Sequence, residues 1–281
     1  MATGFFTDTT LCIGCKACEV ACKQWNELPS DGFEFTGDSY DNTSELSGTT
    51  WRHVAFVEQI DANREAPQDR WRMMSDVCKH CTHAGCLEAC PTGAIIRTEF
   101  DSVFVQPDIC NGCGYCVVSC PFGVIDLIEK FDPAGTHYNL STLSENRREE
   151  KQTALASTGG VAGKCTLCYD RQTLGMEPAC AKACPTDSIQ FGDVAELRER
   201  AKARVETLQA RGVAASLYGA EDVGGGIGAL NAFFLLTDRP ETYNLPPEPV
   251  LPSTRQPAGY AAAALAAVSL ALAGWVIFRD G

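Results

Sequence analysis

Cysteine carries the clearest chemical pattern in this chain of 281 residues. All 16 cysteines lie between Cys12 and Cys184, and they fall into four groups of four. Disulfide pairing does not produce such groups, whereas a metal cluster that needs four thiolate ligands does. The groups are, in chain order, Cys12, Cys15, Cys18 and Cys22; Cys78, Cys81, Cys86 and Cys90; Cys110, Cys113, Cys116 and Cys120; and Cys165, Cys168, Cys180 and Cys184.

The spacing inside each group indicates the kind of metal centre. Groups one and three read C-x2-C-x2-C-x3-C, the run found in bacterial ferredoxins. Groups two and four keep the outer C-x2-C and C-x3-C but widen the middle gap to four and eleven residues. Three thiolates this close in sequence can hold one end of an iron–sulfur cube. The last thiolate lies a helical turn further on and points to a neighbouring cluster. The sequence therefore predicts four 4Fe-4S clusters.

The order of the groups predicts which of them share a pair of clusters. The sequence separation between groups two and three is about the length of one half of a two-cluster ferredoxin, so we expect these two groups to form one compact inner unit. Groups one and four then pair by elimination, which inserts the inner unit into an outer one. Because the last cysteine of each group crosses to the partner cluster, four ligand sets are predicted. They are set A (Cys12, Cys15, Cys18, Cys184), set B (Cys78, Cys81, Cys86, Cys120), set C (Cys110, Cys113, Cys116, Cys90) and set D (Cys165, Cys168, Cys180, Cys22).

Two other cysteine chemistries fit the pattern poorly. Zinc ribbons use two C-x2-C pairs with a longer spacer and no fused third ligand. Disulfides would have to join loops only two residues wide. His80 and His83 lie inside group two, but four thiolates already complete that cluster, so we expect polar neighbours rather than metal ligands. A non-redox zinc module or an iron–sulfur sensor is the rival from another functional class.

Composition and charge exclude several other functions. With 45% hydrophobic residues the chain can bury cores, and its formal net charge of −13 offers no basic surface for nucleic acid. No nucleophile–base pair, carboxylate pair or pterin signature is found, so we expect the chain to move electrons and make no bonds itself. Oxidised clusters would add negative charge, which backbone N–H groups and the nearby bases Lys16, Lys164 and Arg171 would offset.

Short strands are expected around the clusters. Three copies of a Cys-Pro, turn, strand unit occur, as CPTGAI, CPFGVI and CPTDSI. Apolar residues between Ile95 and Val105 predict short strands over the inner clusters, and residues 51–60 alternate as a strand. Residues 30–50 are a polar, turn-rich insertion, and residues 131–163 are predicted to be a long surface excursion.

One amphipathic helix and a glycine-rich turn are expected after the last cysteine group. Asp193 and Glu196 form a capping-box pattern before apolar residues spaced by three and four, up to Gly212. Residues 224–228 do not meet G-x-G-x-x-G, so they predict a turn before an apolar strand over 229–237. Proline-rich residues 240–257 predict an extended strap.

The C-terminal segment predicts a membrane helix. Residues 259–278 carry no charge and are long enough as a helix to cross a bilayer, with Tyr260 and Trp275 near the ends. The alternative is an alanine-rich helix docked on a partner. No signal peptide is expected before Cys12. Either the globular part is cytoplasmic, or a partner carries it across the membrane.

These features predict an α+β protein with two nested ferredoxin-like dicluster units, a β/loop extension and one C-terminal transmembrane helix. The expected segments are 1–28 with 164–212 for the outer unit, 29–77 for an insertion, 78–130 for the inner unit, 131–163 for the connecting excursion, 213–257 for the extension and strap, and 258–281 for the anchor.

The cysteine-rich segments resemble the iron–sulfur beta subunit of membrane-bound respiratory formate dehydrogenases, within the four-cluster ferredoxin-type subunits of molybdopterin oxidoreductases. They read CIGCKACEVACKQWNELP (12–29), KHCTHAGCLEACPTGAI (79–95), DICNGCGYCVVSCPFGV (108–124) and GKCTLCYDRQTLGMEPACAKACPTDSI (163–189), and the resemblance continues through LYGAEDVGGG and DRPETYNLP. Two departures are a longer segment over 131–163 and the absence of the tryptophan that replaces one ligand in nitrate-reductase-like chains.

The resemblance implies partners and a location. It implies an electron relay from a molybdopterin (Mo/W) catalytic alpha subunit to a membrane cytochrome b gamma subunit and the quinone pool. Sets A and D would face the catalytic subunit, sets B and C the cytochrome, and residues 259–278 the lipid bilayer. Co-export with a twin-arginine partner would put the globular part on the outer face of the cell membrane. The nearest rival is the same module in a hydrogenase, or in a sulfoxide or polysulfide reductase.

Overall fold

The computed structural model describes residues 1–30, 41, 43, 45–59, 70–128 and 160–278, and for residues 257–258, 273–274 and 276–278 it describes the backbone alone. Most of the expected insertion over 30–50 and most of the excursion over 131–163 therefore lie outside the described residues.

A four-stranded sheet joins the two ends of the globular part. Its order is β8 (Ile189–Asp193), β1 (Thr3–Asp8), β10 (Ala232–Leu236) and β9 (Ser216–Tyr218). β1 runs antiparallel to β8 and parallel to β10, with Phe6 opposite Phe233. The two rings stack at 5.5 Å between centroids. The extension expected over 213–257 thus shares one sheet with strands of the outer unit.

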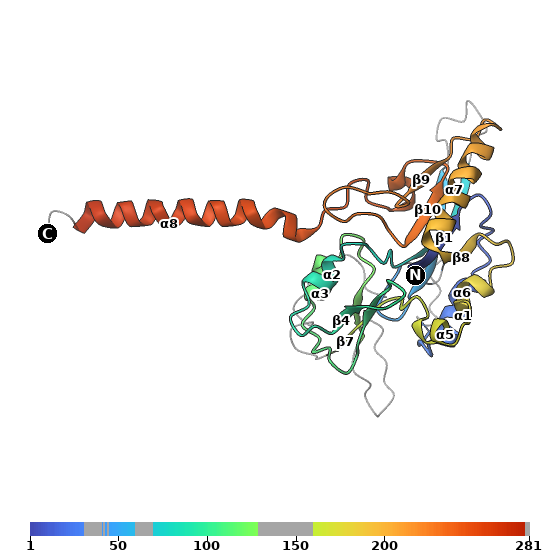
Figure 1. Cartoon of the computed structure of the whole chain (residues 1–281), viewed down its shortest axis with the longest axis horizontal. Helices are drawn as coiled ribbons and strands as arrows, with labels where there is room; N and C mark the ends of the chain where they lie inside the picture. Colours follow the sequence, from blue (N-terminus) through green and yellow to red (C-terminus); the bar gives the residue numbers. More distant parts are fainter. Residues whose placement is uncertain (31–40, 42, 44, 60–69, 129–159, 279–281) are drawn as a thin grey trace.

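Helix α7 (Val194–Gln209) covers one face of this sheet (Figure 1). Its N-terminus is capped as the sequence predicts, because Asp193 Oδ1 accepts hydrogen bonds from the backbone N–H groups of Ala195 and Glu196. Leu197 and Ala201 are buried against Phe6 and other apolar side chains of the sheet. Burial of this apolar stripe fixes the helix on the sheet.

The proline-rich segment covers the other face, and the prediction of an extended strap is wrong for two parts of it. Two 3-10 turns form, η2 (Pro240–Tyr243) and η3 (Pro252–Arg255). Tyr243, Leu245 and Leu251 are buried in the core that includes Phe234. The glycine-rich segment before β10 is a turn, as predicted, with positive φ at four of its glycines, Gly224, Gly225, Gly226 and Gly228.

Two small two-stranded antiparallel sheets and two short helices form the region around groups two and three. β4 (Ile95–Arg97) pairs with β5 (Val103–Val105), as the apolar pattern predicts, and β6 (Asp126–Ile128) pairs with β7 (Val161–Gly163). α2 (Gly85–Glu88) lies against α3 (Tyr115–Ser119). β7 corrects the sequence prediction, because residues 161–163 form a strand of this region rather than the end of a surface excursion.

Groups one and four meet on the other side of the molecule (Figure 1). α1 (Ala17–Trp25) packs on α6 (Ala179–Lys182), and α5 (Tyr169–Thr173) lies beside them. Trp25 Nε1 donates to Asp170 Oδ2 at 2.7 Å, and the Arg171 guanidinium lies 4.2 Å from the Trp25 ring centroid. The hairpin of β2 (Arg52–Gln59), a predicted strand, and β3 (Arg70–Val77) packs beside α1.

Helix α8 (Gln256–Phe278) extends away from the body as a long rod (Figure 1). It leaves beside η3, which packs on α2. Large apolar side chains along it are exposed, among them those of Tyr260, Leu265, Val268, Leu270, Leu272 and Trp275. A search of the residues that the structure describes finds no helix with both the length and the apolarity needed to cross a membrane. The structure therefore does not support the expected transmembrane helix over 259–278.

Candidate metal centres

Each cysteine group combines a tight loop with a short helix. In group one the loop between Cys12 and Cys15 turns at Gly14, whose φ is 66°, and Cys18 and Cys22 lie on α1. A Cβ at Gly14 would come within 2.6 Å of the Phe56 ring, so the turn requires glycine. The third cysteine of each of the other groups also lies on a helix, Cys86 on α2, Cys116 on α3 and Cys180 on α6. The helical turn separates the third cysteine of a group from the fourth.

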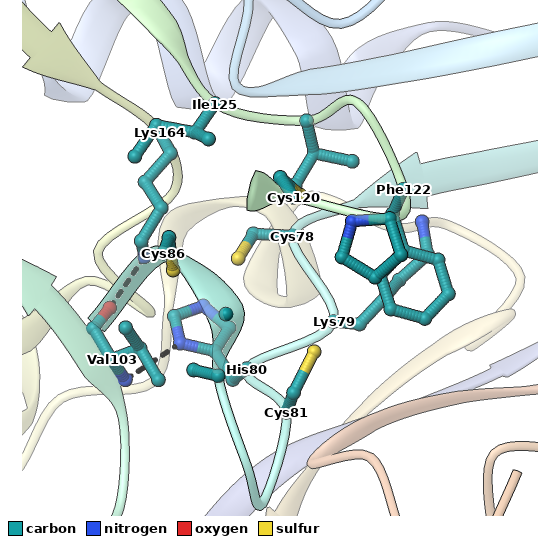
Figure 2. A pocket seen from close by; sticks show the side chains of 14 residues that line it. Cys78, Lys79, His80, Cys81, Cys86, Val103, Cys120, Phe122, Ile125 and Lys164 are labelled. Carbon is teal, nitrogen blue, oxygen red and sulfur yellow. Dashed lines mark hydrogen bonds between the residues drawn. The ribbon is translucent and has the colours of Figure 1, made fainter. Parts of the chain in front are cut away.

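The structure brings the cysteines together across groups. Figure 2 shows one hollow lined by Cys78, Cys81, Cys86 and Cys120, the residues of set B. A second hollow is lined by Cys90, Cys110, Cys113 and Cys116, the residues of set C. A third is lined by Cys12, Cys15, Cys18 and Cys184, the residues of set A. The first three cysteines of one group and the last cysteine of another thus line each hollow.

The residues of set D also lie together. Cys22 lies on α1, which packs on α6, the helix that carries Cys180. Burial raises the pKa of Cys22, and charge on Cys165, Cys180 and Cys168 raises it further. Cys180 likewise raises the pKa of Cys168 and Cys165. Ligation of a cluster by each set stays a prediction, but every predicted set is a spatial neighbourhood of four sulfurs.

All 16 cysteines are free thiols, and many of them are buried. Burial raises the pKa of Cys18, Cys86 and Cys165 to about 12. Bare thiols of this kind stay protonated at neutral pH and serve as ligands only when a metal displaces the proton. Within the described residues no His, Cys, Asp and Glu side chains are arranged to hold a single metal ion.

The walls of the hollows supply the groups that an iron–sulfur cluster with four cysteine ligands requires. Backbone N–H groups point at sulfur, from Ala162 to Cys110 Sγ at 3.4 Å and from Leu167 to Cys165 Sγ at 3.3 Å. Such donors compensate the negative charge of a thiolate-bound cluster. Four sulfur donors, apolar walls and N–H groups aimed at sulfur together fit the predicted 4Fe-4S clusters.

Buried cations accompany the sulfur sets. Lys164 Nζ donates to the carbonyl oxygens of Val103 and Cys165, and its charge opposes the rise in pKa that burial causes at Cys86. Lys79 Nζ donates to Asp76 and to Val77 O. Lys164 is one of the bases that the sequence indicates as offsetting cluster charge. Lys79 and Arg52 are not predicted from the sequence. Lys79, adjacent to Cys78 in sequence, could have been found from that position.

His80 lies in the wall of the set B hollow and takes part in a backbone hydrogen bond. Val103 N–H donates to His80 Nδ1 at 3.1 Å, so the ring proton resides on Nε2. Burial, with help from the charge of Lys164, lowers the pKa of His80 well below its usual range and keeps the ring neutral. His80 Nε2 is buried and has no hydrogen-bond partner within the described chain. It is an N–H donor in the wall of the set B hollow.

Neighbouring sets adjoin one another. Charge on Cys180 of set D acts on Cys18 of set A, charge on Cys78 of set B acts on Cys165 of set D, and charge on Cys116 of set C acts on Cys86 of set B. Set A therefore adjoins set D, set D adjoins set B, and set B adjoins set C. One cysteine of set A and one of set C are exposed, Cys15 and Cys113.

Comparison with known proteins identifies the family. Two models, each described as a 4Fe-4S dicluster domain, match residues 11–94 and residues 69–134 with 151–194. The formate dehydrogenase iron-sulfur subunit of Haemophilus influenzae is 38% identical over 247 residues, which cover 86% of this chain and 68% of that protein. The chain belongs to the formate dehydrogenase iron-sulfur subunit family. This iron-sulfur subunit is an electron-transfer subunit that carries 4Fe-4S clusters.

Other relatives place the iron-sulfur subunit more finely. The nitrate-inducible formate dehydrogenase iron-sulfur subunit of Escherichia coli is 37% identical over 247 residues, 86% of this chain and 71% of that protein. The B subunit of the anaerobic dimethyl sulfoxide reductase of Escherichia coli is 29% identical over 202 residues, 70% of this chain and 76% of that protein. The chain is thus more similar to the formate dehydrogenase subunits than to the sulfoxide reductase subunit.

Proposed function

We propose that this chain holds four 4Fe-4S clusters, one in each of sets A, B, C and D, and relays electrons along the order A, D, B, C. The observation that carries the proposal is that three hollows are lined by the cysteines of sets B, C and A. Electrostatic contacts between cysteines of sets A and D, D and B, and B and C support the order of the relay. Each cluster, when bound, takes up and passes on one electron. The chain supplies the ligands, the N–H groups aimed at sulfur and the buried cations.

The substrate proposed for the complex is formate. The relatives that cover most of this chain are named as formate dehydrogenase iron-sulfur subunits. By the family resemblance, a catalytic subunit with a molybdopterin (Mo/W) site delivers electrons at the set A end, and a membrane cytochrome b receives them at the set C end. Exposed Cys15 and Cys113 at the two ends support an entry and an exit.

The position of α8 supports the direction of this relay. Gly85 of α2 lies close to Leu251 and to Pro252, the first residue of η3, so α8 leaves the body on the side of sets B and C. We propose that the uncharged residues 259–278 embed in lipid next to the cytochrome. The exposed apolar side chains of α8 support an apolar environment around this helix. By the same resemblance the globular part lies on the outer face of the membrane and is exported with its partner.

Two measurements on the native complex test the proposal. Iron and sulfide analysis should give about 16 iron atoms per chain, because four cubanes hold four irons each. Near-zero iron with stoichiometric zinc would overturn the redox function. Formate-dependent dye reduction should be present in the same preparation. Activity on a sulfoxide, polysulfide or hydrogen substrate without activity on formate would assign the relay to another oxidoreductase.

A further inference from the structure

Arg52, the first residue of β2, is a buried cation that no carboxylate of the described chain balances. Only 1% of its surface is exposed. Nη1 donates to Ser75 O at 3.5 Å and to Ser75 Oγ at 3.3 Å, and the guanidinium lies 4.6 Å from the centroid of the Phe5 ring. Nε and Nη2 are buried and have no hydrogen-bond partner among the residues that the structure describes. Such a cation costs stability unless negative charge is supplied from elsewhere.

Sulfur from two sets surrounds this guanidinium. Ser75 Oγ, which contacts Arg52 Nη1, also lies 3.2 Å from Cys18 Sγ of set A. The Phe5 ring, which the guanidinium faces, belongs to the buried cluster that contains Cys18 of set A with Cys165 and Cys180 of set D. Burial alone would lower the pKa of Arg52, but charge on these cysteines and on Cys22 raises it above its usual range. The guanidinium is therefore close to both set A and set D.

We propose that Arg52 is the shared counter-charge of the two outer clusters and raises the reduction potentials of both. Its unpartnered Nε–H and Nη2–H are the donors left for the sulfurs around it, and the Ser75 hydroxyl connects it to Cys18. The inference rests on the proposed function, because it requires clusters in sets A and D.

The sign of the effect follows from the charges. An oxidised 4Fe-4S cluster with four thiolates carries a charge of about −2, and reduction by one electron makes it more negative. A fixed cation stabilises the more negative state more, and hydrogen bonds to sulfur act in the same direction. Removal of the Arg52 charge should therefore lower the reduction potentials of the clusters in sets A and D. The reduction potentials of the clusters in sets B and C should not change.

The experiment is an EPR-monitored redox titration of the complete complex with Arg52→Met and Arg52→Lys. In Arg52→Met the two outer clusters should titrate at least about 59 mV lower, which is a tenfold change in the ratio of reduced to oxidised cluster. Arg52→Lys keeps the charge but loses two N–H donors, so a smaller shift in the same direction is expected. Ser75→Ala should lower the potential of the set A cluster alone.

Arg72 offers a matched control in the same hairpin. Its side chain is 10% exposed, and its guanidinium pairs with Asp238 and also donates to Gln59. Arg72→Met should leave all four potentials unchanged. If Arg52→Met fails to retain its iron, Arg52→Lys and Ser75→Ala still test the inference. Arg52→Lys should lower the potentials of the clusters in sets A and D, and Ser75→Ala should lower that of the set A cluster alone.

Three outcomes would overturn the inference. Unchanged potentials in Arg52 variants with full iron content would overturn it alone, and so would an equal shift of all four clusters. A wild-type complex without four cluster signals would overturn the proposed function and this inference with it.

Discussion

His80 and His83 lie in the same cysteine group, yet the fold gives them different surroundings. His80 is buried, adopts a left-handed backbone conformation with φ of 44°, and accepts a hydrogen bond from the buried Val103 N–H. His83 is exposed. The imidazole of His80 therefore has a structural task, to satisfy Val103, in addition to the N–H that it presents in the set B hollow.

Replacement of His80 by leucine should destabilise the region around set B. The Val103 N–H would lose its acceptor while still buried, which costs about 1–3 kcal/mol. The effect should be measured as faster amide hydrogen exchange of β4 and β5 in the complete complex. His83→Leu is the control and should leave the exchange unchanged. Equal effects of the two substitutions would contradict the assigned role of His80.

The cysteine sets could be predicted from the sequence, whereas the position of Arg52 could not. Short spacings within a group indicate the first three thiols of each set, and the crossed ligation typical of two-cluster ferredoxins indicates the fourth. Arg52 reaches sets A and D only because β2 pairs with β3 and packs beside α1. Nothing near Arg52 in sequence indicates sulfur, and a tertiary contact of this kind has no local signal.

At the scale of elements, the capping pattern correctly predicts the start of α7, whereas the prediction of an extended proline-rich strap is wrong for two parts of it. Asp193 begins α7 as predicted, because its side chain satisfies free N–H groups of the first turn. Pro240 and Pro252 were interpreted as marks of an extended chain, but each begins a 3-10 turn. Proline fits the first turn of a helix, where its missing N–H costs nothing. Buried Tyr243 then fixes the segment on the sheet.

Asp193→Ala should weaken the first turn of α7 by about 1 kcal/mol, because the N–H groups of Ala195 and Glu196 lose their acceptor. Hydrogen exchange of the amides over 194–198 measures the change. Asp193→Asn keeps a capping oxygen and should behave like the wild type. If asparagine proves as damaging as alanine, capping is not what Asp193 contributes.

At the scale of the whole molecule, the sheet is what the sequence pattern could not reveal. The pattern indicates the apolar strand over 229–237 but not its neighbours, and it does not indicate β1 at all. β10 lies beside β1 through parallel pairing, with Phe5 opposite Ala232. Such long-range pairing depends on the packing of α7 and the strap on the two faces of the sheet, which no local signal encodes.

Removal of residues 259–281 tests the role proposed for α8. Because α8 projects from the body and, among the described helices and strands, packs chiefly on η3, the globular part should keep its full iron content. The truncated chain should stay with the catalytic subunit but leave the membrane fraction without detergent, whereas the full chain should require detergent. Retention of the truncated chain in the membrane fraction would contradict lipid embedding by α8.

The parallel pairing of β1 with β10 also constrains how the protein is made. β1 is synthesised before both of its neighbours, β8 and β10, which follow groups two and three in the chain. Cys12, Cys15 and Cys18 likewise wait for Cys184, which also follows groups two and three. The outer half can therefore close only after the inner half has been synthesised, whereas groups two and three are near neighbours in sequence. We expect the inner half to fold first and the outer half to assemble around it.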